Sequence, residues 1–169
     1  MILSQEFQED VPLEDAPLSK EAFIEEVAKH TLPLEKEYGI RPSVTIAQAI
    51  LESNWGQSGL SVQDNNYFGI KGGKSSRQYA TLEYEEDWVE IEASFRSYPS
   101  LQASIEDYAK LIANGTQWDS SLYRGVIDAD NYKDAAYALS DAGYATDPTY
   151  PEKLIALIET YQLDQYDTK

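Results

Sequence analysis

A single glutamate stands near the end of an otherwise apolar segment. Residues 45–56, TIAQAILESNWG, surround Glu52 with apolar and small side chains. Burial of an unpaired carboxylate is unfavourable, and it usually raises the pKa of the group. A carboxyl group that is still protonated near neutral pH can act as a general acid. Most glutamates lie on the solvent edge of a helix, so a solvated position is the alternative for Glu52.

Few other residue types offer catalysis. The chain has no cysteine, which excludes disulfides and thiolate metal sites. The one histidine, His30, cannot form a multi-histidine metal site, and a serine nucleophile would have to share it as base. No phosphate loop or calcium-loop spacing is present. We therefore expect no metal and no cofactor, and carboxylates and tyrosines remain as the catalytic groups.

Size and charge limit the class of protein. The chain of 169 residues has a hydrophobic share of 42% and a net charge of -17, and no internal repeat divides it. Its length suits one domain with a real core. The negative field repels nucleic acid and anionic lipid, so we expect neither nucleic-acid nor membrane partners. A glycan polymer as partner is compatible with this negative charge. We expect a monomer, either by itself or as part of a longer multidomain protein.

The N-terminal segment differs from the rest. Residues 1–17 contain five acidic residues, two prolines and few large apolar groups, which predicts a disordered acidic arm or linker. They lack the basic start and apolar centre of an export signal. We expect residues 18–169 to form the folded domain.

The helix that must position Glu52 is expected from near Ser43 to Gly56. Its apolar stripe comprises Val44, Ala47, Leu51 and Trp55. Gln48 and Glu52 are four residues apart on the flank of this stripe. Glu52 is therefore predicted at the border of the buried face.

Other helices are predicted on both sides of a hairpin. Ser19 is expected to cap a first helix that Pro33 bends or breaks before Gly39. Later helices are expected after Ser100, after Asp130 and, with Pro151 in its first turn, near the end of the chain; a short turn at 122–127 is expected between the first and second of these.

Residues 57–76 read as a loop with an aromatic island, and residues 77–83 and 88–96 alternate like two strands. The fold class is mainly α (α+β): a helical domain with a small β lobe at about 77–96. A cleft between the two parts suits a polymer.

Several segments together resemble glycoside hydrolase family 73, the endo-β-N-acetylglucosaminidases of bacterial autolysins, flagellar-type muramidases and phage lysins. The matching blocks are AQAILESNWG at 47–56, NYFGIKG at 66–72, TLEY at 81–84 with FRSY at 95–98, and GYATDPTY at 143–150. They occur in order, and the resemblance covers roughly residues 20 to 165.

The resemblance implies a lysozyme-like domain that hydrolyses the β-1,4 bond after N-acetylglucosamine in peptidoglycan glycan strands. It matches Glu52 to the catalytic acid, Glu83 to a second carboxylate and Tyr144 to a tyrosine near the acid. Glycoside cleavage does need a raised-pKa acid and usually a second, ionised carboxylate. We expect an apolar setting for Glu52 and an exposed one for Glu83.

The second carboxylate is less well defined. Charged residues replace the glycine that family members often have at the hairpin turn, so Glu85, Glu86 and Glu90 compete with Glu83. Retention, inversion and attack by the substrate's own N-acetyl group all remain open. In the last case Tyr144 could orient the acetamido group and Glu83 would be dispensable.

Further residues are assigned to substrate binding. They are Gln48, Asn66, Tyr67, Phe68, Asp147 and Tyr150. The aromatic members could stack on sugars or fill the core, and Asp147 could orient Tyr144 or cap a turn. The substrate implies an extracellular or cell-wall location. The alternatives are a lytic transglycosylase that uses Glu52 alone, a non-catalytic peptidoglycan-binding module, and an acidic scaffold for a basic partner.

Overall fold

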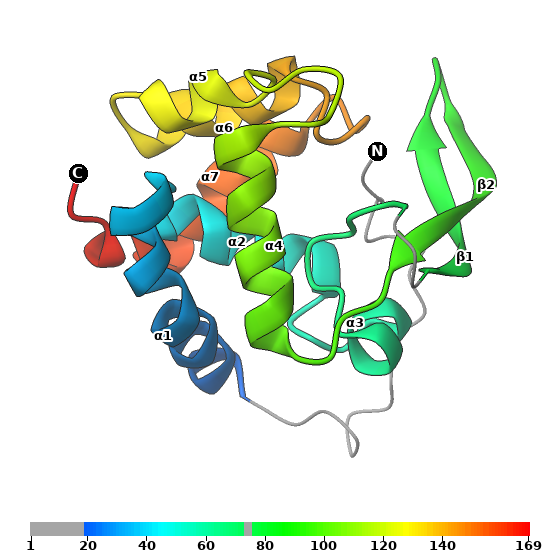
Figure 1. Ribbon diagram of the computed structural model, residues 1–169, viewed down its shortest axis with the longest axis horizontal. Coiled ribbons are helices and arrows are strands. Elements are labelled where there is room, and N and C mark those ends of the chain that lie inside the picture. Colours follow the sequence, from blue (N-terminus) through cyan, green and yellow to red (C-terminus); the bar gives the residue numbers. More distant parts are fainter. Residues whose placement is uncertain (1–18, 73–75) are drawn as a thin grey trace.

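A body of helices carries one β-hairpin at its side (Figure 1). This computed structural model describes residues 19–72 and 76–169; the predicted acidic arm, residues 1–17, lies outside the described residues. The helices are α1 (Lys20–Tyr38), α2 (Pro42–Ser53), α3 (Gly59–Asp64), α4 (Leu101–Asn114), α5 (Arg124–Asp128), α6 (Tyr132–Asp141), α7 (Tyr150–Tyr161) and the 3-10 helix η3 (Leu163–Tyr166). The strands are β1 (Ser76–Tyr84) and β2 (Trp88–Arg96). The predicted fold class is confirmed, with the hairpin between α2 and α4.

Helix α2 lies at the centre of the helical body. All 12 of its residues are buried, and α1, α6, α7 and η3 pack against it. In Figure 1 it crosses behind α4, between α1 and α7. A helix that is enclosed on all sides has no solvent face. The predicted border position of Glu52 is therefore wrong in one respect, because the flank of α2 is as buried as its apolar stripe.

The helix ends mostly follow their predicted caps. Ser19 accepts a hydrogen bond from the Ala22 amide, as predicted. Helix α6 is capped by Asn131 and not by Asp130. Pro33 does not break α1, which continues to Gly39. Pro33 lies on the exposed side of the helix, where water can hydrate the carbonyl that has lost its partner.

Helix α3 was not predicted within the loop. Ser58 accepts a hydrogen bond from the Ser61 amide and so caps it. Its six residues are too few to show a helical period. The C-terminal residue of α3, Asp64, attaches the base of the hairpin. It accepts hydrogen bonds from Tyr79 at 2.5 Å and Ser97 at 2.9 Å, and it pairs with Arg77 at 3.1 Å.

The two strands pair in antiparallel register, from Ser76 opposite Arg96 to Tyr84 opposite Trp88. The turn between them contains Glu86 at a φ of 69°. Near the tip, the Tyr84 amide donates a hydrogen bond of 3.0 Å to the Thr146 hydroxyl. The hairpin is therefore held to the helical body both at its base and near its tip.

The start of α2 is capped by a residue far along the chain. Arg41, in the N-cap position, provides no side-chain cap. Instead Asp167 accepts hydrogen bonds from the Ser43 amide at 2.7 Å and the Ser43 hydroxyl at 2.6 Å. The Arg41 guanidinium donates to the carbonyls of Lys169 at 2.6 Å and Ala129 at 2.8 Å. The segment after η3 thus completes the helix that carries Glu52.

We predict that Asp167→Ala lowers the free energy of unfolding by about 1 to 2 kcal/mol, because it removes the cap of α2. Urea denaturation measures this loss. Asp164→Ala, in the neighbouring exposed turn, is the matched control and should change stability by less than about 0.5 kcal/mol. Equal effects of the two substitutions would contradict the capping role.

Candidate active site

Glu52 is a buried carboxyl without a hydrogen bond. Its exposed fraction is 1%, and neither oxygen has a hydrogen-bond partner among the described residues. Burial raises its pKa well above the usual 4.5, and the nearby charges of Glu83 and Asp147 raise it further. The Tyr150 hydroxyl approaches the carboxyl without reaching hydrogen-bond geometry, and it opposes this rise in part. Glu52 is therefore suited to hold its proton at a pH where an ordinary glutamate has lost it.

A cluster of aromatic rings forms the surroundings of Glu52. Tyr144 lies at its centre, with ring centroids 5.8 Å from Tyr123 and 6.2 Å from both Tyr108 and Tyr150. Burial raises the pKa values of Tyr144 and Tyr150 well above their ordinary value. Both hydroxyls are consequently neutral donors at physiological pH. The four tyrosines of this cluster bring no positive charge that would lower the pKa of Glu52.

Gln48 connects two of these hydroxyls. Its amide nitrogen donates to the Tyr150 hydroxyl at 3.1 Å, and its carbonyl oxygen accepts from Tyr108. Since the Tyr150 oxygen already accepts a hydrogen bond, its own proton is available for the Glu52 carboxyl. Gln48 lies one helical turn before Glu52, so α2 positions both the acid and the group that orients its neighbour.

Glu83 is buried, not exposed. Its exposed fraction is 4%, which makes the prediction of an exposed setting wrong. The inward face of β1 carries Glu83 against the loop that precedes α7, where the Thr146 hydroxyl donates 2.7 Å to Oε2. The Lys71 ammonium forms an ion pair with Oε1. Both oxygens of Glu83 therefore have partners, in contrast to those of Glu52.

The competing acidic residues of the hairpin point elsewhere. Glu85 and Glu86 lie exposed in the turn, and Glu90 is exposed on β2. Of these four hairpin glutamates, Glu83 is the buried one, and its charge raises the pKa of Glu52. The two carboxyls have opposite environments, one unpaired in an apolar site and one paired with a cation. Such a division suits a general acid and a second, ionised carboxylate.

Asn66 and Asp147 hold backbone turns beside the site. The Asn66 side chain donates 2.9 Å to the carbonyls of Ile70 and Arg96, and it accepts from the Ile70 amide at 3.1 Å. Asp147 accepts from the amide and hydroxyl of Thr149, both at 2.8 Å, and from Lys153 at 2.6 Å. Burial would raise the pKa of Asp147, but these donors outweigh it and lower the pKa.

The predicted aromatic residues lie mainly in the core. Phe68 is fully buried and stacks on Tyr108 at 4.3 Å, and its carbonyl accepts a hydrogen bond of 3.1 Å from the Tyr144 hydroxyl. Tyr67 is half-buried, with its ring 6.2 Å from that of Phe23. Tyr150 is buried and serves the Glu52 surroundings, as described above.

Two partners of the site were not predicted from the sequence. Lys71 and Thr146 hold Glu83, although both lie inside the sequence blocks that resemble the family.

In the described part of the chain, no group of three or more His, Asp or Glu side chains could hold a metal ion. Within the same residues, no helix has the length and apolar character needed to cross a bilayer.

The sequence and fold match known proteins. The family model described as mannosyl-glycoprotein endo-beta-N-acetylglucosaminidase matches residues 28–163. The chain is 44% identical over 154 residues to Exo-glucosaminidase LytG of Bacillus subtilis, covering 88% of this chain and 54% of that protein. It is 39% identical over 155 residues to a probable N-acetylmuramidase of Lactococcus lactis, covering 88% of this chain and 35% of that protein. The chain thus spans about half or less of these relatives.

Solved structures also match this chain. The catalytic domain of the autolysin Auto from Listeria monocytogenes is 43% identical, with a TM-score of 0.77 over 92% of this chain and 98% of that chain. The glycoside hydrolase domain of FlgJ from Salmonella typhimurium, C-terminally truncated, is 28% identical, with a TM-score of 0.64 over 85% and 98% of the two chains. The fold is lysozyme-like. The chain therefore belongs to the glucosaminidase family, glycoside hydrolase family 73.

Proposed function

We propose that this chain is a peptidoglycan hydrolase that cleaves β-1,4 bonds of the glycan strand as an endo-β-N-acetylglucosaminidase. The observation that carries the proposal is the buried, unbonded carboxyl of Glu52, whose pKa is raised. Family membership and the names of the relatives support the substrate. A glycan-strand substrate implies that the protein acts at the cell wall, outside the cell.

Glu52 is the general acid in this proposal. Its retained proton passes to the glycosidic oxygen as the bond to the leaving sugar breaks. Tyr150, oriented by Gln48, donates to the carboxylate that remains. This hydrogen bond stabilises the anion formed during the step.

Glu83 is the second carboxylate. Its negative charge, held by Lys71 and Thr146, stabilises the positive charge that develops on the sugar ring. To activate a water molecule, Glu83 exchanges the Thr146 hydrogen bond for one to water. If the acetamido group of the substrate is the nucleophile, Glu83 acts through its charge alone and Tyr144 lies among the groups that position the sugar.

We predict that Glu52→Gln lowers the rate of wall hydrolysis about 10²- to 10⁴-fold, because the amide cannot donate the proton. Release of reducing ends from purified cell walls measures the rate. Glu25→Gln, on the exposed face of α1, is the matched control and should retain full activity. A wild-type rate in the Glu52→Gln protein would contradict the proposal.

The products of the same digestion identify the bond. Borohydride reduction followed by mass spectrometry is expected to show reduced N-acetylglucosamine ends on fragments of many lengths. Reduced N-acetylmuramic acid ends would indicate a muramidase, and anhydro ends a lytic transglycosylase. Single sugars released from strand ends would indicate an exo enzyme. Binding to walls without new ends would indicate a non-catalytic module.

We predict that Glu52 destabilises the fold as the pH rises. Its pKa is higher in the folded chain than the 4.5 of an ordinary glutamate, so above pH 4.5 the unfolded chain loses this proton first. Its contribution to stability is complete below that pH and is lost as the pH rises toward the folded-state pKa. The difference in unfolding free energy between wild type and Glu52→Gln should fall by up to about 1.4 kcal/mol per pH unit.

Urea denaturation of both proteins between pH 4 and 8, at about 25 °C, gives this difference. Because every other titrating group is shared, its contribution cancels in the comparison. A difference that stays constant over the whole range would show that the folded state does not retain the Glu52 proton.

We predict that Glu83 is the only hairpin glutamate whose charge matters to catalysis. Glu83→Gln should lower kcat about 10²-fold or more, because the charge that stabilises the transition state is lost. Glu85→Gln and Glu90→Gln remove the same charge at exposed positions of the hairpin and should retain kcat. Wild-type kcat in Glu83→Gln would instead favour a mechanism in which Glu52 acts alone.

A further inference from the structure

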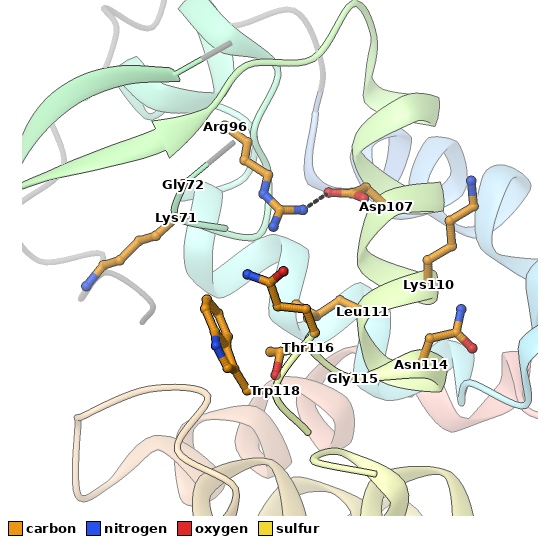
Figure 2. Close-up of a pocket in the computed structure, with 11 residues that line it drawn as sticks. Lys71, Gly72, Arg96, Asp107, Lys110, Leu111, Asn114, Gly115, Thr116 and Trp118 are labelled. Carbon is orange, nitrogen blue, oxygen red and sulfur yellow. Dashed lines mark hydrogen bonds and ion pairs between the residues drawn. The ribbon is translucent and has the colours of Figure 1, made fainter. Parts of the chain in front are cut away.

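A cavity of about 530 Å³ lies between the base of the hairpin and the C-terminal half of α4. Its walls include Lys71, Arg96 and the loop that carries Trp118 (Figure 2). We call it the α4 pocket. Lys71 lines the α4 pocket, and its ammonium also forms the ion pair with Glu83. The pocket therefore adjoins the candidate active site through one side chain.

The lining of the α4 pocket is rich in cations. The chain has 30 acidic and 13 basic residues, yet Lys71, Arg96 and Lys110 lie here with Asp107 as the one acidic lining residue. Asp107 is already occupied, because it forms an ion pair of 2.8 Å with Arg96 and accepts a hydrogen bond from the Tyr98 hydroxyl. Lys110 is exposed and has no ion pair within 4 Å in the described part of the chain. Since Lys71 pairs with Glu83 and Arg96 with Asp107, Lys110 is the cation of this lining that remains available to a ligand.

Helix α4 presents this lining along one face. Asp107, Lys110, Leu111 and Asn114 follow the three- and four-residue spacing of neighbours on a helix surface. Figure 2 shows the Arg96 side chain reaching from β2 toward the middle of the pocket, with Trp118 across from it. The pocket thus combines charge, an amide and an aromatic ring.

Trp118 is held in an exposed position by a tight loop. The exposed fraction of Trp118 is 85%. Gly115 adopts a φ of 66°, and a Cβ there would lie 2.2 Å from the Asp119 carbonyl oxygen. The Thr116 amide donates to that oxygen at 3.0 Å, and the Asp119 amide donates to the Thr116 hydroxyl at 3.1 Å. The turn orders the backbone beside Trp118 and leaves the indole in water, where it can stack on a ligand.

We propose that the α4 pocket is a substrate subsite for the carboxylate-bearing peptide arm of a peptidoglycan sugar. The inference rests on the proposed function, and it names which part of the strand the site recognises beyond the scissile bond. The N-acetylated sugar backbone is neutral, whereas the peptide arms carry carboxylates. Lys110 binds such a carboxylate, and Trp118 packs against the apolar face of the sugar or peptide beside it.

The test compares two soluble glycan strands that differ only in charge. One is the native strand with its peptide arms; in the other, carbodiimide and ammonia have converted the carboxylates to amides. Binding to Glu52→Gln protein, which does not consume the strand, is measured by calorimetry at low salt. We expect amidation to weaken binding about five-fold or more, within the range of exposed to partly buried ion pairs.

Variants assign the effect to the pocket. Lys110→Gln in the same background should weaken binding of the native strand about three- to five-fold and leave the amidated strand unchanged. Trp118→Ala should weaken both strands about ten-fold. Lys29→Gln and Tyr137→Ala remove an exposed cation and an exposed ring outside the pocket, and both should bind like the parent.

Equal binding of native and amidated strands would overturn the subsite. So would a loss in Lys110→Gln that Lys29→Gln matches, because that would reflect net charge alone. Hydrolysis by the wild type is scored separately. If no bond is cut while carboxylate-dependent binding persists, the proposed function fails and the subsite stands. If hydrolysis proceeds while binding ignores the carboxylates, the subsite fails and the proposed function stands.

Discussion

The isolation of one carboxyl group from water is the constraint on which the rest of the structure depends. Burial favours the protonated form of Glu52, and it follows from the packing of α1, α6, α7 and η3 around α2. Other contacts must offset the unfavourable burial of a polar group without hydrogen bonds. The tyrosine cluster does so in part, since its rings add apolar contact while its hydroxyls bond to Gln48 and to the Phe68 carbonyl.

Glu83 shows how the same residue type receives a different role within one site. A lysine and a threonine occupy its two oxygens, whereas neither oxygen of Glu52 has a hydrogen-bond partner among the described residues. The two partners come from different segments: Lys71 from the loop before the hairpin, and Thr146 from the loop before α7. The second carboxylate is therefore placed by the assembly of three segments, whereas the first depends on one helix and its packing.

The sequence predicted what local periodicity and composition determine. The long helices, the hairpin and the apolar setting of Glu52 follow from spacing and caps, and the order of the family blocks predicted the lysozyme-like fold. Alternation along β1 could assign Glu83 to one face, but it could not show that the loop at Thr146 covers that face. Lys71 and Thr146 likewise needed tertiary structure, because they are 75 positions apart along the chain. Helix α3 was too short to detect. Pro33 did not break α1, because buried residues on both sides of it hold the helix in place.

The cap that Asp167 supplies to α2 links the order of synthesis to the assembly of the site. Residues 42–53 leave the ribosome long before residue 167 exists, so the helix that carries the acid waits for its first turn to be completed. Until then the Ser43 amide has no carboxylate partner, and a half-made domain lacks this contact. The helix that carries Glu52 therefore reaches its full stability only after nearly all of this domain has been made.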